Sequence, residues 1–310
     1  MILNTGQRTD IPAYYSDWFY NRIKEGYVLV RNPFYPTQVT KYLINPEVVD
    51  IICFCSKNPE PMLERFHELD AFKKIFHITI TPYGREIEPN VPEYPKVLET
   101  FKRVSEFCGK NAMALRYDPI FISEKYTVDF HKEAFSKMVT TLSGYTDEVI
   151  VSFIDMYEKT IKNFPEAMTV PMDIQWELIE YFVNEAKKVG MRVKTCLENP
   201  EFERAGAVVT GCMAKEDVER VLQEEIVLRG NKYNVREGCN CLLGGDIGAY
   251  NSCGHGCKYC YANYDTEVVK ANMKLHDKNS PMLIGNLTPQ DIVHESLQQK
   301  FATGQRFFSL

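Results

Sequence analysis

The stretch Cys253-Gly-His-Gly-Cys257-Lys-Tyr-Cys260 places three cysteines within eight residues, near the end of a 310-residue chain. Gly254 and Gly256 give the backbone the freedom that such a tight turn needs, so the three thiols can face one centre. Cysteine thiolates bind zinc and iron–sulfur clusters, and both usually take four protein ligands. Three cysteines therefore either recruit a fourth ligand from elsewhere or leave one metal position open for chemistry.

The nearest candidates for a fourth ligand are Cys239, Cys241 and His255. If one of them completes the set, the loop is a zinc knuckle that stabilises the fold. Without such a ligand, the loop suits an iron–sulfur cluster with one open iron. Local spacing leaves both alternatives open, and the choice between them decides whether the chain is an enzyme.

Other cysteines form a second possible metal site. Cys196 and Cys212 follow predicted strands, and Cys239 and Cys241 precede the cysteine-rich stretch, so these four can surround another metal. The alternative is plain buried thiols, because cysteine is among the most buried residue types. Core packing is the interpretation for the cysteines inside regular elements, which are Cys53, Cys55 and Cys108.

Composition limits the partners and the compartment. The net charge is −6 and no long Lys/Arg run occurs, which favours a small-molecule or peptide substrate over nucleic acid. No apolar run approaches the roughly 20 residues of a membrane span, and the first residues lack a signal-peptide pattern. Ten cysteines without such a signal favour reduced, metal-binding thiols. We therefore expect a cytoplasmic protein that does not enter a membrane.

Apolar runs alternate with helical patterns along most of the chain. Buried strands are predicted at residues 48–55, 76–80, 112–117, 149–154 and 191–195. Helical spacing of apolar residues is present at 61–69, 93–107, 128–142 and 173–186. Repeated strand–loop–helix units predict an α/β fold, with a parallel sheet forming a partial or full (β/α) TIM-like barrel. No linker divides the chain, so one domain is expected over residues 1–310, with residues 239–310 carrying the cysteine-rich stretch and a C-terminal extension.

Polar residues cluster just after the predicted strands, at positions that share one rim of such a barrel. They are Thr9, Asp10, Lys57, Asn58, Thr81, Arg116, Asp118, Ser152 and Glu198. Lys57 and Arg116 can each bind a carboxylate, although ordinary solvated charges are the alternative. Asp118 can pair with Arg116 or bind ribose hydroxyls. Glu198 can also bind ribose hydroxyls.

The spacing of Cys253, Cys257 and Cys260, with the aromatic Tyr259 in the last gap, resembles the cluster loop of radical S-adenosylmethionine (SAM) enzymes. The resemblance implies that the three cysteines hold a [4Fe-4S] cluster whose fourth iron binds the amino and carboxylate groups of SAM. It also implies a barrel fold in which this loop follows the first strand. Here the loop lies near the end of the chain, so the resemblance implies a circular permutation.

Further motifs carry the likeness along the chain. Thr9-Asp10, Ser56-Lys57 and Glu88-Pro89 resemble features of the spore photoproduct lyase-like branch of that superfamily. The chain is also similar to the DUF1848 family in its motifs Arg8-Thr-Asp-Ile-Pro12, Ser56-Lys-Asn-Pro59, Glu88-Pro-Asn-Val-Pro92, Arg116-Tyr-Asp-Pro119 and Asp246-Ile-Gly248. The Gly-Gly-Glu motif that many superfamily members use for SAM is missing, because Gly244-Gly245-Asp246 precedes the cysteines.

The branch resemblance implies that Lys57 binds the SAM carboxylate, with Thr9 and Thr79 or Thr81 nearby. The implied reaction is reductive cleavage of SAM to methionine and a 5′-deoxyadenosyl radical, which abstracts hydrogen from a substrate that the sequence does not identify. A flavodoxin or ferredoxin-like partner would supply the low-potential electron. The alternatives are a non-catalytic protein stabilised by zinc or an iron–sulfur cluster, an electron carrier, and an enzyme that transfers the aminocarboxypropyl group of SAM.

Overall fold

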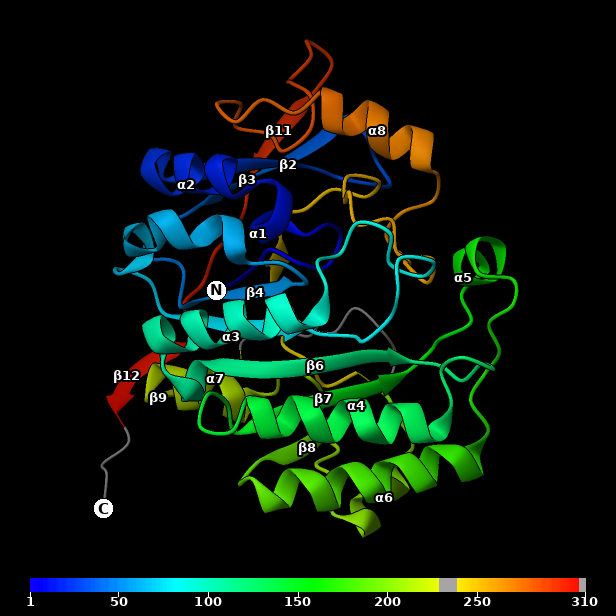
Figure 1. Cartoon of the computed structure of the whole chain (residues 1–310). Coiled ribbons are helices and arrows are strands. Elements are labelled where there is room, and N and C mark those ends of the chain that lie inside the picture. The colour runs from blue at the N-terminus through cyan, green and yellow to red at the C-terminus, as the bar shows by residue number, and fades with distance from the viewer. Residues whose placement is uncertain (229–238, 307–310) are drawn as a thin grey trace.

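A computed structural model describes residues 1–228 and 239–306 of the chain. Its centre is a seven-stranded sheet in which all neighbouring strands are parallel (Figure 1). In spatial order the strands are β10 (Gly245–Asp246), β1 (Ile2–Asn4), β4 (Ile51–Ser56), β5 (Lys74–Thr79), β6 (Met113–Ile120), β7 (Glu148–Phe153) and β8 (Arg192–Thr195). The predicted parallel α/β sheet is confirmed.

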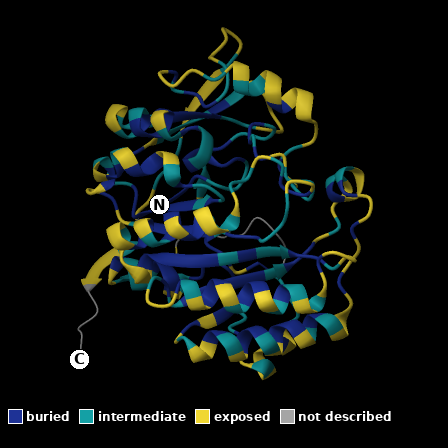
Figure 2. Cartoon of the chain, in the orientation of Figure 1, coloured by how far each residue is buried: buried dark blue, intermediate teal, exposed yellow. Residues whose placement is uncertain are grey.

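One face of the main sheet is covered by helices (Figure 1). They are α1 (Ile11–Tyr14), α2 (Ser16–Glu25), the 3-10 helix η1 (Glu60–Leu69), α3 (Tyr94–Cys108), α4 (Val128–Thr141) and α6 (Met172–Lys188). Successive strand residues point to opposite faces, so Phe54 and Phe76 face these helices, with ring centroids 4.5 Å apart. The predicted apolar stripe of α3 is buried, and Figure 2 shows α3, α4 and α6 exposing only their outer sides.

The opposite face of the sheet is covered by segments from the second half of the chain. Ile51, Cys53 and Ile75 pack against Val218 and Leu222 of α7 (Lys215–Leu222). The strands β9 (Glu224–Ile226) and β12 (Ala302–Arg306) pair antiparallel beside them. Toward the carboxyl ends of the strands this face becomes polar and rich in cysteine, and the candidate site lies there.

Further elements surround this core. A second, three-stranded sheet joins β2 (Tyr27–Arg31) and β3 (Gln38–Leu43) to β11 (Ile292–Glu295) near the end of the chain. The remaining helices are η2 (Lys110–Ala112), α5 (Glu158–Asn163), η3 (Pro200–Ala205) and α8 (Thr266–Lys274). None of the helices within residues 1–228 and 239–306 has the length and apolarity needed to cross a bilayer.

The described strands do not close into a barrel. β10 and β8 are the two edges of the sheet, and past β8 the ladder continues only as an isolated bridge between Lys194 and Val208. The expectation of a full barrel is therefore not met by the described residues. Closure would require strands that bond β8 to β10, and the described residues form none.

The edge strand β10 places a late segment of the chain beside its first strand. Leu3 pairs with Gly245 and Asn4 with Asp246, so the N-terminal strand separates β10 from the rest of the sheet. Gly244 has φ +60°, and a Cβ there would lie 2.1 Å from the Ile2 carbonyl oxygen. The close approach of β10 to β1 therefore requires glycine at this position.

We predict that Gly244→Ala destabilises the protein by about 3 kcal/mol or more, because the side chain would collide with the β1 backbone as well as strain its own. Gly26→Ala is the matched control, since Gly26 has φ +77° and open space around its Cβ position. This control should cost only the left-handed strain of about 1–2 kcal/mol. Urea unfolding under reducing conditions measures both, and equal losses would contradict the close approach.

Candidate functional site

The cysteine loop, residues 253–260, follows β10 at the carboxyl edge of the main sheet, where the loops after β1, β4 and β5 also lie. Backbone contacts fix its course: Asn90 donates its side-chain amide to the Gly254 oxygen (2.8 Å) and its backbone N–H to the His255 oxygen (3.1 Å). Asn263 Nδ2 donates to the Cys253 oxygen (2.7 Å). The loop is therefore held from both sides.

Both glycines of the loop are needed, as the sequence predicted. A Cβ on Gly254 would lie 2.7 Å from the ring of Tyr14. Gly256 has φ +70°, a backbone conformation that other residues rarely adopt. The loop can therefore turn its three cysteines inward while lying against α1.

The three loop cysteines, Cys253, Cys257 and Cys260, are protonated thiols in the absence of a cation. Burial raises the pKa of each above its usual value, and the carboxylate of Asp10 adds to the rise at Cys253. The ammonium of Lys57 opposes the rise at Cys257. A bound metal would replace the protons, because thiolates are the form that ligates.

Asp10 connects the cysteine loop to the sheet. One of its carboxylate oxygens, Oδ1, accepts from Ser56 Oγ (2.7 Å) and from Ala13 N at the start of α1 (3.1 Å). The other, Oδ2, accepts from Lys57 N (2.8 Å) and lies 2.8 Å from His255 Nε2. One buried carboxylate thus holds the end of β4, the start of α1 and the cysteine loop together.

Lys57 points toward the cysteine loop and is fixed by a second buried carboxylate. Its Nζ donates to Glu88 Oε1 (2.9 Å) and to Thr81 Oγ1 (2.8 Å). Tyr259 of the loop donates its hydroxyl to the same Glu88 oxygen, and its ring lies 5.6 Å from Lys57 Nζ. An ammonium group has three donors, so two are used here and one is left for a ligand.

The candidates for a fourth ligand to the loop cysteines have other partners. Both ring nitrogens of His255 are engaged, Nε2 with Asp10 (2.8 Å) and Nδ1 with the Tyr14 hydroxyl (3.1 Å). Cys241 lies with Cys196 and Cys212, and Cys239 Sγ accepts from the Cys241 N–H (3.4 Å). The knuckle in which one of these residues completes the set is therefore not formed by the described structure.

Two groups of described residues have all their ligand atoms within 4.8 Å of one another, and the loop cysteines belong to neither. The groups are Cys196/Cys212/Cys241 and Cys53/Cys55/His77. Thiolates about 2.3 Å from one tetrahedral ion lie about 3.8 Å apart. In this arrangement the three loop sulfurs are not all within 4.8 Å of one another.

The predicted second cysteine group is brought together by the fold, and it can hold a metal ion. Cys196, Cys212 and Cys241 meet, and Cys239 is buried next to Cys241. The sequence analysis did not anticipate the group formed by Cys53, Cys55 and His77. Register pairing of Cys55 with His77 on adjacent strands creates it, and only the strand alignment could have indicated this.

Arg116 and Asp118 form an ion pair between the second cysteine group and the rim. Burial would lower the pKa of Arg116, but Asp118 and the nearby thiols of Cys212 and Cys55 raise it well above its usual value. The guanidinium therefore stays charged and faces potential metal ligands. Its predicted pairing with Asp118 is present.

Ser152 and Glu198 form a second polar pair on this rim. Glu198 Oε1 accepts from Ser152 Oγ (2.7 Å) and Phe153 N (2.8 Å). Burial raises the pKa of Glu198 to about 7, although these two hydrogen bonds partly oppose the rise. Of the other predicted residues, Thr79 lies beside Arg116 in the strand register, and the buried Thr9 Oγ1 has no hydrogen-bond partner among the described atoms.

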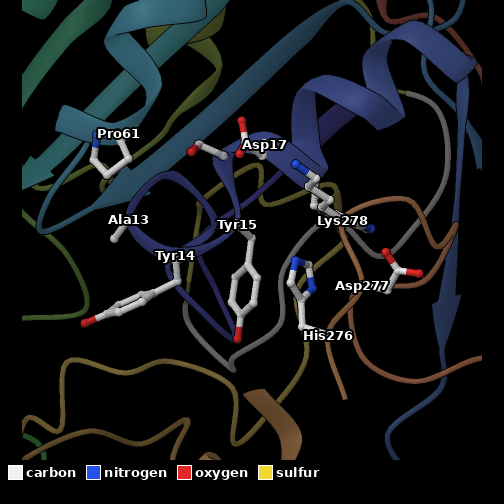
Figure 3. Close-up of a pocket in the computed structure, with 10 residues that line it drawn as sticks. Ala13, Tyr14, Tyr15, Asp17, Pro61, His276, Asp277 and Lys278 are labelled. Atoms are coloured by element: carbon white, nitrogen blue, oxygen red, sulfur yellow. The ribbon is translucent and has the colours of Figure 1, made fainter. Parts of the chain in front are cut away.

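Two cavities border the site. One of about 280 Å³ is lined by Glu198, Cys196 and Cys239, so it adjoins the second cysteine group. A larger cavity of about 560 Å³ is lined by Tyr15 and His276 and by none of the loop cysteines (Figure 3). The ring centroids of Tyr15 and His276 lie 4.6 Å apart. Tyr14 also lines the larger cavity while its hydroxyl reaches His255.

Sequence reasoning missed three residues of the site. Glu88 was noticed only as part of a Glu-Pro motif, and His255 only as a possible ligand, whereas both position other groups. Tyr14 was interpreted as helix packing and not as a site residue, because its partner His255 lies 241 positions away. The Glu-Pro motif is the only local signal for Glu88, because its partner Lys57 lies 31 positions away.

We predict that Asp10→Asn lowers the free energy of unfolding by at least about 2 kcal/mol. Hydrogen-bond donors face both carboxylate oxygens, and the NH₂ group of an amide would replace one oxygen and could not accept from its donors. Iron binding should fall as the loop loosens. The measurements are urea unfolding and iron content after anaerobic purification. Asp17→Asn is the control. Asp17 forms an exposed ion pair with Arg65, so its loss should lower the free energy of unfolding by less than about 1 kcal/mol. Unchanged stability and iron content in Asp10→Asn would refute this role.

Comparison with known proteins identifies a family and no curated relative. No curated protein matches the chain. The family model described as "Domain of unknown function (DUF1848)" matches residues 2–262, from the first strand to just beyond the cysteine loop. This confirms the resemblance to the DUF1848 family, and the helix α8 and strands β11 and β12 lie outside the match. The chain belongs to the DUF1848 family.

Proposed function

We propose that this protein is a radical SAM enzyme, in which the loop cysteines hold a [4Fe-4S] cluster with one iron open to SAM. The observation that carries the proposal is that the three candidate fourth ligands, His255, Cys239 and Cys241, all have other partners. His255 is bonded through both nitrogens, and Cys239 and Cys241 lie with the second cysteine group. The three loop thiols then remain without a fourth ligand from these candidates.

The topology supports a permuted partial barrel. β10 precedes the cysteine loop and lies at the sheet edge, parallel to β1, which is followed in space by β4, β5 and β6. In this order the strand with the cluster loop comes first, although it comes last in the sequence. The Thr9-Asp10, Ser56-Lys57 and Glu88-Pro89 motifs then follow successive strands, as in the branch that the sequence resembles.

The protein's own groups would bind and orient SAM. Lys57 would hold the carboxylate with its remaining donor, because Glu88 and Thr81 fix the ammonium beside Cys257. The unpartnered hydroxyl of Thr9 is available to a polar group of the ligand. Tyr259 closes one side of this position through its bond to Glu88. Thr79 stays a candidate through its place in β5.

The substrate side of the site would lie toward Arg116, Asp118, Ser152 and Glu198. The 280 Å³ cavity beside Glu198 suits a small molecule, or one residue of a peptide, better than a nucleic-acid duplex. When bound, the cluster would supply the electron that cleaves SAM into methionine and a radical able to abstract hydrogen. A flavodoxin or ferredoxin-like donor in the cytoplasm would deliver that electron.

The deciding experiment is anaerobic reconstitution with iron, sulfide, SAM and dithionite, followed by mass analysis of the products. We expect 5′-deoxyadenosine and methionine from the wild type. Cys253→Ala, Cys257→Ala and Cys260→Ala should each abolish cleavage, and Cys108→Ala, which changes a thiol at the end of α3, should retain it. Iron without SAM cleavage would indicate an electron carrier, zinc without iron a structural site, and an aminocarboxypropyl product a different bond cleaved.

We further predict that Lys57→Ala weakens SAM binding about 10- to 100-fold, the equivalent of one hydrogen bond to a charged group. Lys258→Ala is the matched control, because this lysine of the same loop points away to Glu166 (2.9 Å). Equilibrium binding to the reconstituted, unreduced protein measures both constants. Wild-type affinity in a Lys57→Ala protein with normal iron content would exclude Lys57 as the carboxylate ligand.

A further inference from the structure

We propose that Cys196, Cys212 and Cys241, with Cys239 as fourth ligand, bind one tetrahedral Zn²⁺ ion that fastens together the two edges of the main sheet. This site is independent of the loop cysteines, and of whether they support SAM chemistry. Its residues come from three separate segments of the chain, all within the described ranges.

The sulfur positions suit a single ion. Cys241 Sγ lies 3.3 Å from Cys212 Sγ and 3.6 Å from Cys196 Sγ, and all three sulfurs are within 4.8 Å of one another. Four thiolates around one zinc lie about 3.8 Å apart, because each Zn–S bond is about 2.3 Å long. Three thiols at one point cannot all form disulfides, whereas one ion can take all of them.

The surroundings of the sulfurs are those of metal-bound thiolates. The Cys212 N–H donates to Cys241 Sγ (3.1 Å) and the Cys241 N–H to Cys239 Sγ (3.4 Å), so two sulfurs accept backbone hydrogen bonds. Such outer contacts orient and stabilise metal ligands. Gly211 has φ +102°, and a Cβ there would lie 2.9 Å from Cys241 Sγ, so glycine leaves room for the sulfur.

The group is buried against an apolar patch of the sheet. Ala114 of β6 and Ile150 of β7 pack against Cys212, Cys239 and Cys241. Charged thiolates in such a setting are costly unless they are paired. A divalent cation supplies that pairing, and the nearby positive charge of Arg116 offsets the excess negative charge of a four-thiolate site.

The position of the site gives the ion a structural role. Cys196 directly follows β8 at one edge of the sheet, whereas Cys239 and Cys241 precede β10 at the other edge. Next to Cys241 and Cys212, the Leu242 N–H donates to the Met213 oxygen (2.8 Å), which also joins these two segments. The ion would therefore close the side of the sheet that the strands leave open.

The test uses the variant C253A/C257A/C260A, which removes the loop thiols, purified anaerobically and analysed for metals and acid-labile sulfide. We expect about one zinc per chain and no sulfide. Adding C212S/C241S should remove the zinc. Adding C53S/C55S is the matched control and should leave it, because Cys53 and Cys55 belong to the neighbouring group with His77.

X-ray absorption at the zinc edge of the wild-type protein provides a measurement that does not depend on a variant folding. The expected result is a shell of sulfur alone at about 2.3 Å. Five results would each overturn the site. Three concern zinc content: no zinc, zinc that survives C212S/C241S, and loss of zinc with C53S/C55S. The other two are iron with sulfide in place of zinc, and a zinc shell with two or more nitrogen or oxygen ligands. SAM cleavage can fail while the zinc stays, so the two proposals are tested separately.

Discussion

The buried carboxylate of Asp10 is the contact on which the arrangement of the site depends. It accepts hydrogen bonds from α1, from Ser56 and the Lys57 backbone after β4, and it contacts His255 in the cysteine loop. A carboxylate this deeply buried is stable only when its lone pairs are used, so the loop, the helix start and the strand end must keep one relative position. Lys57 is placed beside the loop thiols as a consequence, and Glu88 then fixes the direction of its side chain.

The two cysteine groups divide the carboxyl edge of the sheet between them. The loop cysteines lie on the side of β10, β1 and β4, where a donor of Lys57 and the hydroxyl of Thr9 are left without a partner among the described atoms. The second group lies on the side of β8, in an apolar setting without an unused charge of its own. Arg116 and Asp118 lie between the second group and the rim. This division matches a reactive centre on one side and a stabilising centre on the other.

Much of the fold was predictable because its signals are local. The helical stripe of α3 and the buried strands β4 to β8 follow from apolar periodicity alone. The strand β3 was missed because most of its residues are only partly buried, and β11 because its residues are exposed. The loop cysteines were evident from their spacing. The pair of Asp10 and His255 joins residues 245 positions apart, and nothing in the neighbourhood of either indicates the other. Barrel closure was likewise beyond sequence reasoning, since it depends on whether two distant edges meet.

The adjacency of β1 and β10 also sets an order of events during protein synthesis. A ribosome makes β1 and β4 to β8 long before it makes β10, so most of the sheet can pair while the cysteine loop does not yet exist. Two contacts that hold this loop come from segments already translated, Asn90 and Asp10, whereas Asn263 follows the loop in the chain. The loop can therefore reach its final position only after the strands β1 and β4 to β8 have been made, and before α8, β11 and β12 have been.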